Sequence, residues 1–208
     1  MTKVILITGA SSGIGKITAE YLATNGYAVY GTSRKPKEQG RNFKLIALDV
    51  RNKESIDLAV SEVVKNEGRI DVLINNAGMG ITGPIEDTPT DEMRQVFETN
   101  FFGAIEVMKS VLPIMRDQKE GLIINVTSIA GYMGLPFRGI YSATKGALEI
   151  VSEAVSMEVQ NFGIKVCNVA PGDFATNIAS GRYHTPVFDK SAYKDIYQKN
   201  LDLMDSHV

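Results

Sequence analysis

Short apolar runs alternate with longer amphipathic segments along most of the chain. The apolar runs consist almost entirely of Val, Ile and Leu, which is typical of parallel strands that are buried on both faces. They predict strands over residues 3–8, 28–32, 43–48, 72–75, 121–126 and 165–170. Apolar positions at helical spacing predict helices over residues 13–25, 52–66, 91–116 and 141–162. Strands that alternate with helices imply a parallel sheet with right-handed crossovers and helices on both faces.

The pattern changes at two places. Pro113 lies inside the helical segment 91–116, so that helix is expected to bend or end within a turn of it. Beyond Pro171 the chain is rich in Gly, Thr, Ser and Asn, and residues 187–204 are only weakly periodic. Because no repeat or linker divides the sequence, we predict a single doubly wound α/β domain over residues 1–208. Residues 173–208 would form a substrate-loop region.

The composition is ordinary for a globular protein, with 44% hydrophobic residues, 22% charged residues and a formal net charge of −2. The chain carries no basic tract, so a nucleic-acid partner is not expected. The longest apolar runs are much shorter than the roughly 20 residues that span a bilayer, and no secretory signal precedes the first strand. The single cysteine, Cys167, is expected to be a buried and inert thiol in a cytoplasmic protein.

A glycine-rich loop joins the first predicted strand to the first predicted helix and reads T-G-A-S-S-G-I-G over residues 8–15. Such a loop lets the backbone approach a pyrophosphate, whose charge then meets the unpaired N–H groups of the helix N-terminus. A tight turn alone also selects glycine, but the strand-loop-helix context favours nucleotide binding. The residues expected to contact the phosphates are Gly9, Ser11, Ser12, Gly13, Ile14 and Gly15.

Tyr141 and Lys145 stand four residues apart at the start of the last predicted helix. Residues at this spacing lie on one helix face, so the phenol and the ammonium would point into the same space. A nearby positive charge lowers the pKa of a tyrosine from its usual value of about 10, because it favours the phenolate. The pair is therefore a candidate proton donor and acceptor. Taken alone, the same spacing also fits an ordinary amphipathic helix.

The sequence N-N-A-G over residues 75–78 follows the fourth predicted strand, between the glycine-rich loop and the Tyr-x-x-x-Lys pair. With these three motifs in this order, the chain resembles the short-chain dehydrogenase/reductase family over residues 1–176. The resemblance implies a Rossmann-type sheet and the transfer of a hydride between a nicotinamide and a carbonyl or alcohol. Relatives usually carry a further helix and a seventh strand. Without these, the sixth strand would be a sheet edge, whether the chain is naturally short or its end is missing.

The resemblance also implies the catalytic roles. Tyr141 would act as the general acid or base, and Lys145 would lower the pKa of its phenol and bind the nicotinamide ribose. Ser128, at the end of the fifth predicted strand, would donate a hydrogen bond to the substrate oxygen and stabilise developing charge. Asn100 would anchor a water that leads from Lys145 towards solvent, although an asparagine in an apolar helical pattern can also be purely structural.

The end of the second predicted strand bears on the choice of cofactor. Ser33 stands where NAD-binding proteins generally place an acid, and Arg34 follows it. A guanidinium can bind a 2′-phosphate, so NADP(H) is predicted. NAD(H) stays an alternative, because Ser12 occupies a position that is basic in many NADP-using relatives. The remaining cofactor contacts implied by the resemblance are Asp49, Val50, Asn76, Ala77, Gly78, Pro171, Gly172 and Thr176, with Asp49 equally able to cap the next helix.

The substrate is expected to be an apolar or mixed carbonyl or alcohol compound. The residues that would face either the substrate or the core are Met79, Ile81, Leu135, Pro136, Phe137, Phe174, Tyr183 and Phe188. Residues 83–86 and 134–137 resemble loops of hydroxysteroid and retinol dehydrogenases. His184 is expected at the surface, no side chains have metal-ligand spacing, and a homodimer is predicted. Two other functions fit less well, namely a non-catalytic NADP(H)-binding or redox-sensing protein and a nucleotide-sugar epimerase.

Overall fold

The computed structural model describes residues 2–37, 42–172 and 181–205. Six strands form one parallel sheet in the order β3-β2-β1-β4-β6-β7. Their bounds are Val4–Ile7 (β1), Ala28–Ser33 (β2), Lys44–Ala47 (β3), Val72–Asn75 (β4), Gly121–Val126 (β6) and Ile164–Val169 (β7). The predicted doubly wound parallel sheet is confirmed. All six strands end at the same edge, where ligands bind in open α/β sheets.

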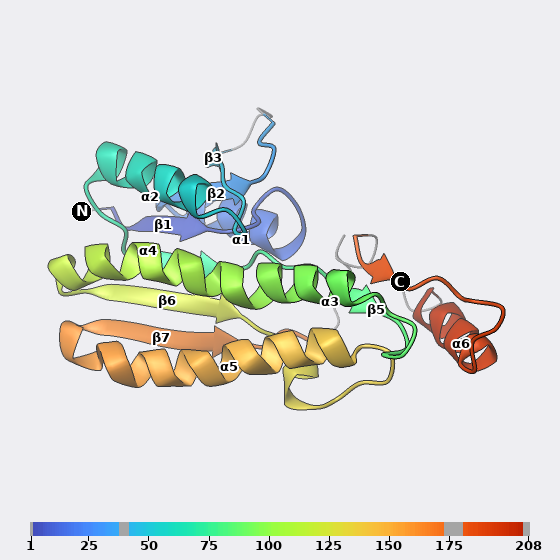
Figure 1. Cartoon of the computed structure of the whole chain (residues 1–208). Helices are drawn as coiled ribbons and strands as arrows, with labels where there is room; N and C mark the ends of the chain where they lie inside the picture. Colours follow the sequence, from blue (N-terminus) through green and yellow to red (C-terminus); the bar gives the residue numbers. More distant parts are fainter. Residues whose placement is uncertain (1, 38–41, 173–180, 206–208) are drawn as a thin grey trace.

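Helices cover both faces of this sheet. The helices are α1 (Gly13–Thr24), α2 (Lys53–Glu67), α3 (Thr90–Phe97), α4 (Gly103–Gln118), α5 (Gly139–Val159) and α6 (Lys194–Asp205). Figure 1 shows α2, α4 and α5 on one face, with α1 on the other. The strands supply both cores by alternation, since Val4 and Leu6 pack towards α2 and α4 while Ile5 and Ile7 pack towards α1.

The single long helix expected over residues 91–116 is instead α3 and α4 joined by a π-helical turn, Glu98–Phe102. A π-turn adds a residue to a helical turn, and apolar periodicity cannot reveal it. The helix was also expected to bend or end within a turn of Pro113, and it does not end there, because α4 continues to Gln118. Val111 and Met115, on either side of the proline, are buried in the core, and this packing compensates for the lost backbone hydrogen bond.

Two short strands and one helix were not predicted. β5 (Ile81–Thr82) and β8 (Tyr183–His184) pair in parallel beyond the end of the main sheet. Helix α6 lies past the carboxyl ends of the strands (Figure 1) and is anchored by Tyr197, which is 1% exposed and donates to the Thr82 carbonyl at 3.0 Å. Ile196 and Leu203 of the same helix are exposed, which explains why this segment shows so little periodicity.

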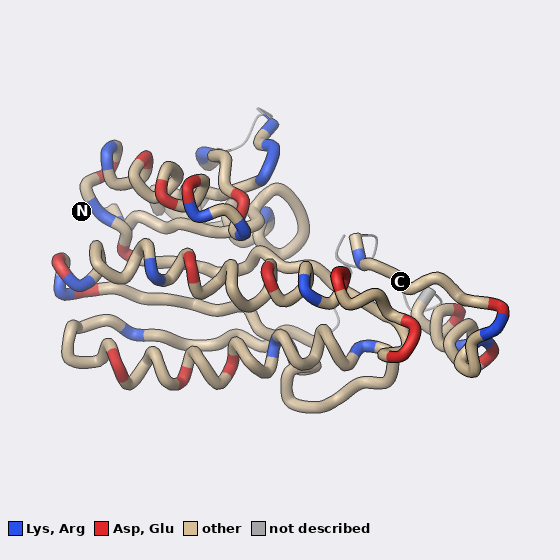
Figure 2. Tube along the Cα trace, viewed as in Figure 1, with Lys and Arg blue, Asp and Glu red and all other residues tan. Residues whose placement is uncertain are grey.

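β7 is an edge strand, as expected for the sixth strand of the sheet. Cys167 in this strand is exposed, so the expected burial of this thiol was wrong. The side chain lies on the face of the strand opposite to Ile164 and Val166, which pack in the same core as Val159 of α5. Figure 2 shows acidic and basic residues interspersed along the outer helices α2 and α4. Among the described helices, none has the length and apolar character needed to cross a bilayer.

Candidate active site

The glycine-rich loop lies directly on the segment that follows β4. Gly9 has a φ of +68°, and a Cβ there would come within 2.8 Å of the Ala77 Cα atom. A Cβ on Gly15, in the first turn of α1, would overlap the Asn76 side-chain amide and lie 2.5 Å from the Gly9 carbonyl oxygen. Both positions therefore exclude any larger residue, as a close backbone approach requires.

Asn76 holds this loop in place. Its side-chain Nδ2 donates to the carbonyl oxygens of Thr8, at 3.0 Å, and Gly9, at 3.1 Å. In return, the Thr8 hydroxyl accepts the backbone N–H groups of Asn76 and Ala77, both at 3.0 Å. Asn76 was expected among the cofactor contacts, but its side-chain amide uses its donors to fix the shape of the loop.

The N-terminus of α1 has the features of an anion site. Ser12 precedes it with an extended backbone, and neither a side-chain cap from Ser12 nor an acidic residue occupies its first turn in the described structure. Its first N–H groups are therefore available, while Ser11 and Ser12 are exposed beside them. Since a Cβ would fill the approach at Gly9 and Gly15, the loop fits the pyrophosphate of a dinucleotide.

The ends of β2 and β3 carry the second group of candidate cofactor residues. Arg34 is exposed, and the Ser33 hydroxyl accepts the Lys35 N–H at 3.3 Å. The Asp49 carboxylate accepts three hydrogen bonds from the backbone and guanidinium of Arg51, at 3.0 to 3.2 Å. These bonds, together with the charge of Arg34, lower the pKa of Asp49. Arg34 and Asp49 therefore lie close enough to interact.

Asp49 does not cap the helix that follows it. The N-cap of α2 is Asn52, whose side chain accepts the Ser55 N–H at 2.9 Å. The capping alternative for Asp49 is thus excluded. Val50 is buried, and a Cβ on Gly103 would meet its Cγ2 atom at 2.7 Å, so its side chain packs against the start of α4. Only the backbone of Val50 could line an adenine site.

Tyr141 and Lys145 share one face of α5, as their spacing predicted. The Lys145 Nζ atom lies 6.0 Å from the centroid of the Tyr141 ring. Lys145 is 4% exposed and donates to the Val126 carbonyl oxygen at 2.7 Å, where β6 ends. Burial lowers the pKa of Lys145 to about 8. At neutral pH most of this lysine still carries a charge, so a positive group lies beside the Tyr141 ring.

Asn100 lies in the π-turn, is buried, and makes three hydrogen bonds with its side chain. Oδ1 accepts the Met79 N–H at 2.8 Å, and Nδ2 donates to the Met79 carbonyl at 2.9 Å and to the Thr144 hydroxyl at 3.1 Å. The Asn100 side chain therefore holds the segment that follows β4, at Met79, against α5, at Thr144. Because both hydrogens of Nδ2 are used, a water anchored at this residue would have to donate to one of its oxygen atoms.

Gly78 lies beside both Asn100 and Lys145. A Cβ at Gly78 would lie 3.3 Å from Asn100 Oδ1 and 3.7 Å from Lys145 Nζ. On the other side, Ser128 follows β6, is half-buried, and its Oγ atom accepts the Ala130 N–H at 3.2 Å. The Pro171 carbonyl accepts the Ile129 N–H at 3.1 Å, which places the segment after β7 beside the turn that Ser128 begins. Thr176 and Phe174 lie outside the described residues.

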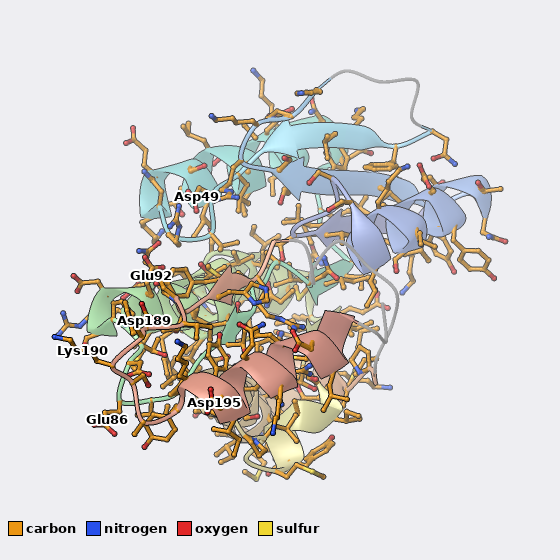
Figure 3. All side chains as sticks on the ribbon, turned by 90° about the vertical axis from the view of Figure 1, so that its right-hand side faces the viewer. Asp49, Glu86, Glu92, Asp189, Lys190 and Asp195 are labelled. Atoms are coloured by element: carbon orange, nitrogen blue, oxygen red, sulfur yellow. The ribbon has the colours of Figure 1, made fainter. Side chains whose placement is uncertain are left out.

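Of the predicted substrate-facing residues, some pack inside the protein and others are exposed. Ile81 is buried in β5, and Phe137, with a φ of +61°, packs its ring 5.2 Å from that of Tyr197. Phe188 is exposed, as is His184. Figure 3 views this end of the molecule and shows Asp49 apart from Glu86, Asp189 and Asp195, which lie near α6. Asp49, expected near the adenine, thus lies apart from the segments expected near the substrate, along the carboxyl edge of the sheet.

The comparisons with known proteins agree with this geometry. The family described as short chain dehydrogenase matches residues 3–186. The chain belongs to this family of oxidoreductases. It is 47% identical over 204 residues to a 3-ketodihydrosphingosine reductase of Bacteroides thetaiotaomicron, covering 98% of this chain and 76% of that protein.

Two solved structures of the family show the same fold. A short-chain dehydrogenase from Streptomyces avermitilis has a TM-score of 0.87 and 37% identity, with 99% of this chain and 78% of that chain covered. ElxO, solved with NADP bound, has a TM-score of 0.81 and 31% identity, with coverage of 99% and 80%. A nicotinamide-dependent enzyme is the conclusion that the family supports.

Sequence reasoning missed several residues that hold the site together. Thr144 lies inside the Tyr-x-x-x-Lys motif, accepts from Asn100 and donates to the Tyr141 carbonyl at 2.8 Å. Arg51, which pairs with Asp49, was also missed, and Met79 was expected to act through its side chain rather than through the backbone groups that Asn100 binds. The one available signal was Thr144 itself. It is a polar residue within the helical turn from Tyr141 to Lys145, where its hydroxyl needs hydrogen-bond partners if it is buried. The other contacts join residues far apart in sequence or depend on the backbone, and no local pattern marks them.

Proposed function

We propose that this dehydrogenase reduces a ketone with NADPH, and that Tyr141 donates the proton to the carbonyl oxygen. The observation that carries this proposal is the buried ammonium of Lys145 beside the Tyr141 ring, next to a glycine loop that fits a dinucleotide. The bound nicotinamide would supply the hydride. The protein supplies a phenol beside a buried ammonium at a defined place.

Ser128 complements the tyrosine. Its Oγ atom accepts the Ala130 N–H, so the hydroxyl is oriented and keeps its own proton to donate. A hydroxyl that donates to the substrate oxygen stabilises the negative charge that develops there. Asn100 and Thr144 fix the backbone on both sides of the pair, through Met79 and Tyr141. Preorganised donors of this kind require no rearrangement during the reaction.

A keto compound with a long apolar chain is the substrate class that we propose. A relative that is 47% identical over nearly the whole chain is named for 3-ketodihydrosphingosine, a keto substrate. Met79, whose backbone Asn100 binds, is apolar, as are Leu135 and Phe137 in the loop that precedes α5, and such residues favour an apolar ligand over a sugar. NADPH oxidation with 3-ketodihydrosphingosine, compared with a short-chain ketone, tests this choice. Equal kcat/KM for both would contradict it.

Tyr141→Phe tests the mechanism. The variant keeps the ring and removes the proton, so kcat should fall by about 1,000-fold or more while the Kd for NADPH changes by less than about two-fold. Stopped-flow NADPH oxidation and fluorescence titration measure the two quantities. An active Phe variant would contradict the assignment. If the wild-type protein bound NADPH tightly but reduced none of a panel of ketones, aldehydes and diketones, a sensing function would replace the enzymatic one.

A further inference from the structure

The turn that carries Ser128 lies against α5 through two glycines. This turn is the 3-10 helix η2, Ile129–Tyr132, which Ser128 precedes as its N-cap. A Cβ on Gly146 of α5 would lie 2.9 Å from the Gly131 carbonyl oxygen. A Cβ on Gly131 would lie 3.0 Å from the Gly146 nitrogen and 3.2 Å from the Lys145 Cβ. The two backbones are thus in direct contact beside Lys145, with no room for a side chain on either.

Ser128 is tied to η2 at both its backbone and its side chain. The Gly131 N–H donates to the Ser128 carbonyl at 2.8 Å, and the Ala130 N–H donates to its Oγ at 3.2 Å. A displacement of η2 would therefore move the hydroxyl with it. On the other side of the contact, Tyr141 and Lys145 belong to the rigid helix α5.

A second link joins the same two elements one turn further along α5. The Tyr132 hydroxyl donates to Glu149 Oε1 at 3.2 Å, and the Oε2 atom of this carboxylate is buried with no partner among the described residues. In Figure 1, the yellow segment after β6 runs beside the first turns of α5. The glycine contact and the Tyr132–Glu149 hydrogen bond together fix η2 on the helix that carries the proposed acid.

We propose that Gly131 and Gly146, with the Tyr132–Glu149 pair, are positioning residues that set the place of the Ser128 hydroxyl relative to the Tyr141 phenol. The inference rests on the proposed roles of Ser128 and Tyr141. Both groups must reach one substrate oxygen, so their separation has to match within a fraction of an ångström. A misplacement of about 1 Å can cost roughly 100-fold in rate.

Gly146→Ala should separate η2 from α5. We expect kcat for the ketone to fall by about 10- to 100-fold. The Kd for NADPH should change by less than about two-fold, because the glycine loop is distant in the chain and has its own contacts. Gly139→Ala is the matched control on the same helix, since a Cβ there would meet only Ile85 Cδ1, at 3.8 Å. It should leave kcat unchanged. An unchanged kcat in Gly146→Ala would overturn the proposal.

A double-mutant cycle with Ser128→Ala separates positioning from general damage. If Gly146 acts through Ser128, adding Gly146→Ala to Ser128→Ala should lower the single-turnover rate by less than about two-fold. Independent, multiplicative losses would contradict the inference. If Ser128→Ala alone retained the full rate, the proposed role of Ser128 would fail instead. Should Gly146→Ala not fold, Tyr132→Phe serves in the same cycle, with an expected loss of a few-fold that disappears when Ser128 is absent.

Discussion

Lys145 is held in a buried position by its bond to the Val126 carbonyl, and burial lowers its pKa from 10.5 to about 8. Removing a charged group from water costs free energy, and here Val126 is its hydrogen-bond partner in the described structure. The fold tolerates this cost at the one lysine that faces Tyr141. At the scale of single residues, the candidate catalytic pair is therefore a source of instability in the folded protein.

This cost should be visible as a pH dependence of stability. Below pH 8, both the folded and the unfolded chain carry a proton on Lys145, and the penalty is complete. Between pH 8 and 10.5 the unfolded chain binds more protons at this site, so the free energy of unfolding should rise with pH. Relative to Lys145→Met, the wild-type protein should gain up to about 3 kcal/mol over this range, measured by urea unfolding. Parallel pH profiles would contradict the burial of a charged lysine.

Arg34 allows a second test at the residue scale. It is exposed at the end of β2 and lies near Asp49, where an adenosine 2′-phosphate would be found. Arg34→Ala should raise the KM for NADPH by about ten-fold or more and the KM for NADH by less than about two-fold. Lys37→Ala, which removes a charge from the same loop, is the control and should affect both cofactors little. Equal effects of Arg34→Ala on both would remove the preference for NADP(H).

At the scale of elements, the π-turn between α3 and α4 decides where Asn100 lies. The turn directs this side chain inward, where it pairs with both backbone groups of Met79 as a neighbouring strand would, and also with Thr144. Three elements, namely the segment after β4, the π-turn and α5, are thereby fixed to each other. Insertions of this kind in helices are frequent at functional sites.

Asn100→Ala should therefore destabilise the protein strongly. It leaves the part-buried N–H and carbonyl of Met79 and the buried Thr144 hydroxyl without this partner, which should cost about 2–4 kcal/mol in the free energy of unfolding. Urea unfolding measures this loss, and Thr99→Ala, at the neighbouring half-buried position, provides the control. A loss below about 1 kcal/mol would show that the π-turn does not depend on this amide.

At the scale of the whole molecule, the outward face of α5 carries a row of small and apolar residues. Ile150 and Met157 are 69% and 67% exposed, and they continue a stripe with Ala143, Ala147 and Ala154 at helical spacing. An exposed apolar stripe on a long helix is typical of a contact between subunits. We propose that two copies of the chain pair through this face.

Light scattering should then give about twice the 22.7 kDa mass of the chain. Ile150→Glu should yield monomers with the secondary structure intact, because it places a charge in the contact. Leu58→Glu, at a position on α2 that is 66% exposed and off the stripe, should leave the dimer unchanged. A wild-type mass of one chain at micromolar concentration would contradict the pairing.

Periodicity predicted the main sheet well, because strands such as β1 and β4 are buried on both faces and are marked by their own apolar residues. It failed for α6, where one residue, Tyr197, provides the anchor, and for β5 and β8, which are two residues long. Cys167 shows the same limit. Its residue type indicated burial, but its exposure depends on what covers β7, which is a property of distant segments.

The sequence by itself determined the fold class, the dinucleotide loop and the Tyr141–Lys145 pair, because each depends on residues that are close together in the chain. Tertiary structure alone decided which polar side chains form hydrogen bonds within the protein and which stay available to a ligand. The Asn76 amide is bound to the loop, Asn52 rather than Asp49 caps α2, and the Asn100 side chain clamps Met79. The contact of Gly131 with Gly146 was likewise decided by tertiary structure alone. Hydrogen bonds and close approaches between distant segments follow from how the elements pack, and no local pattern of residues specifies them.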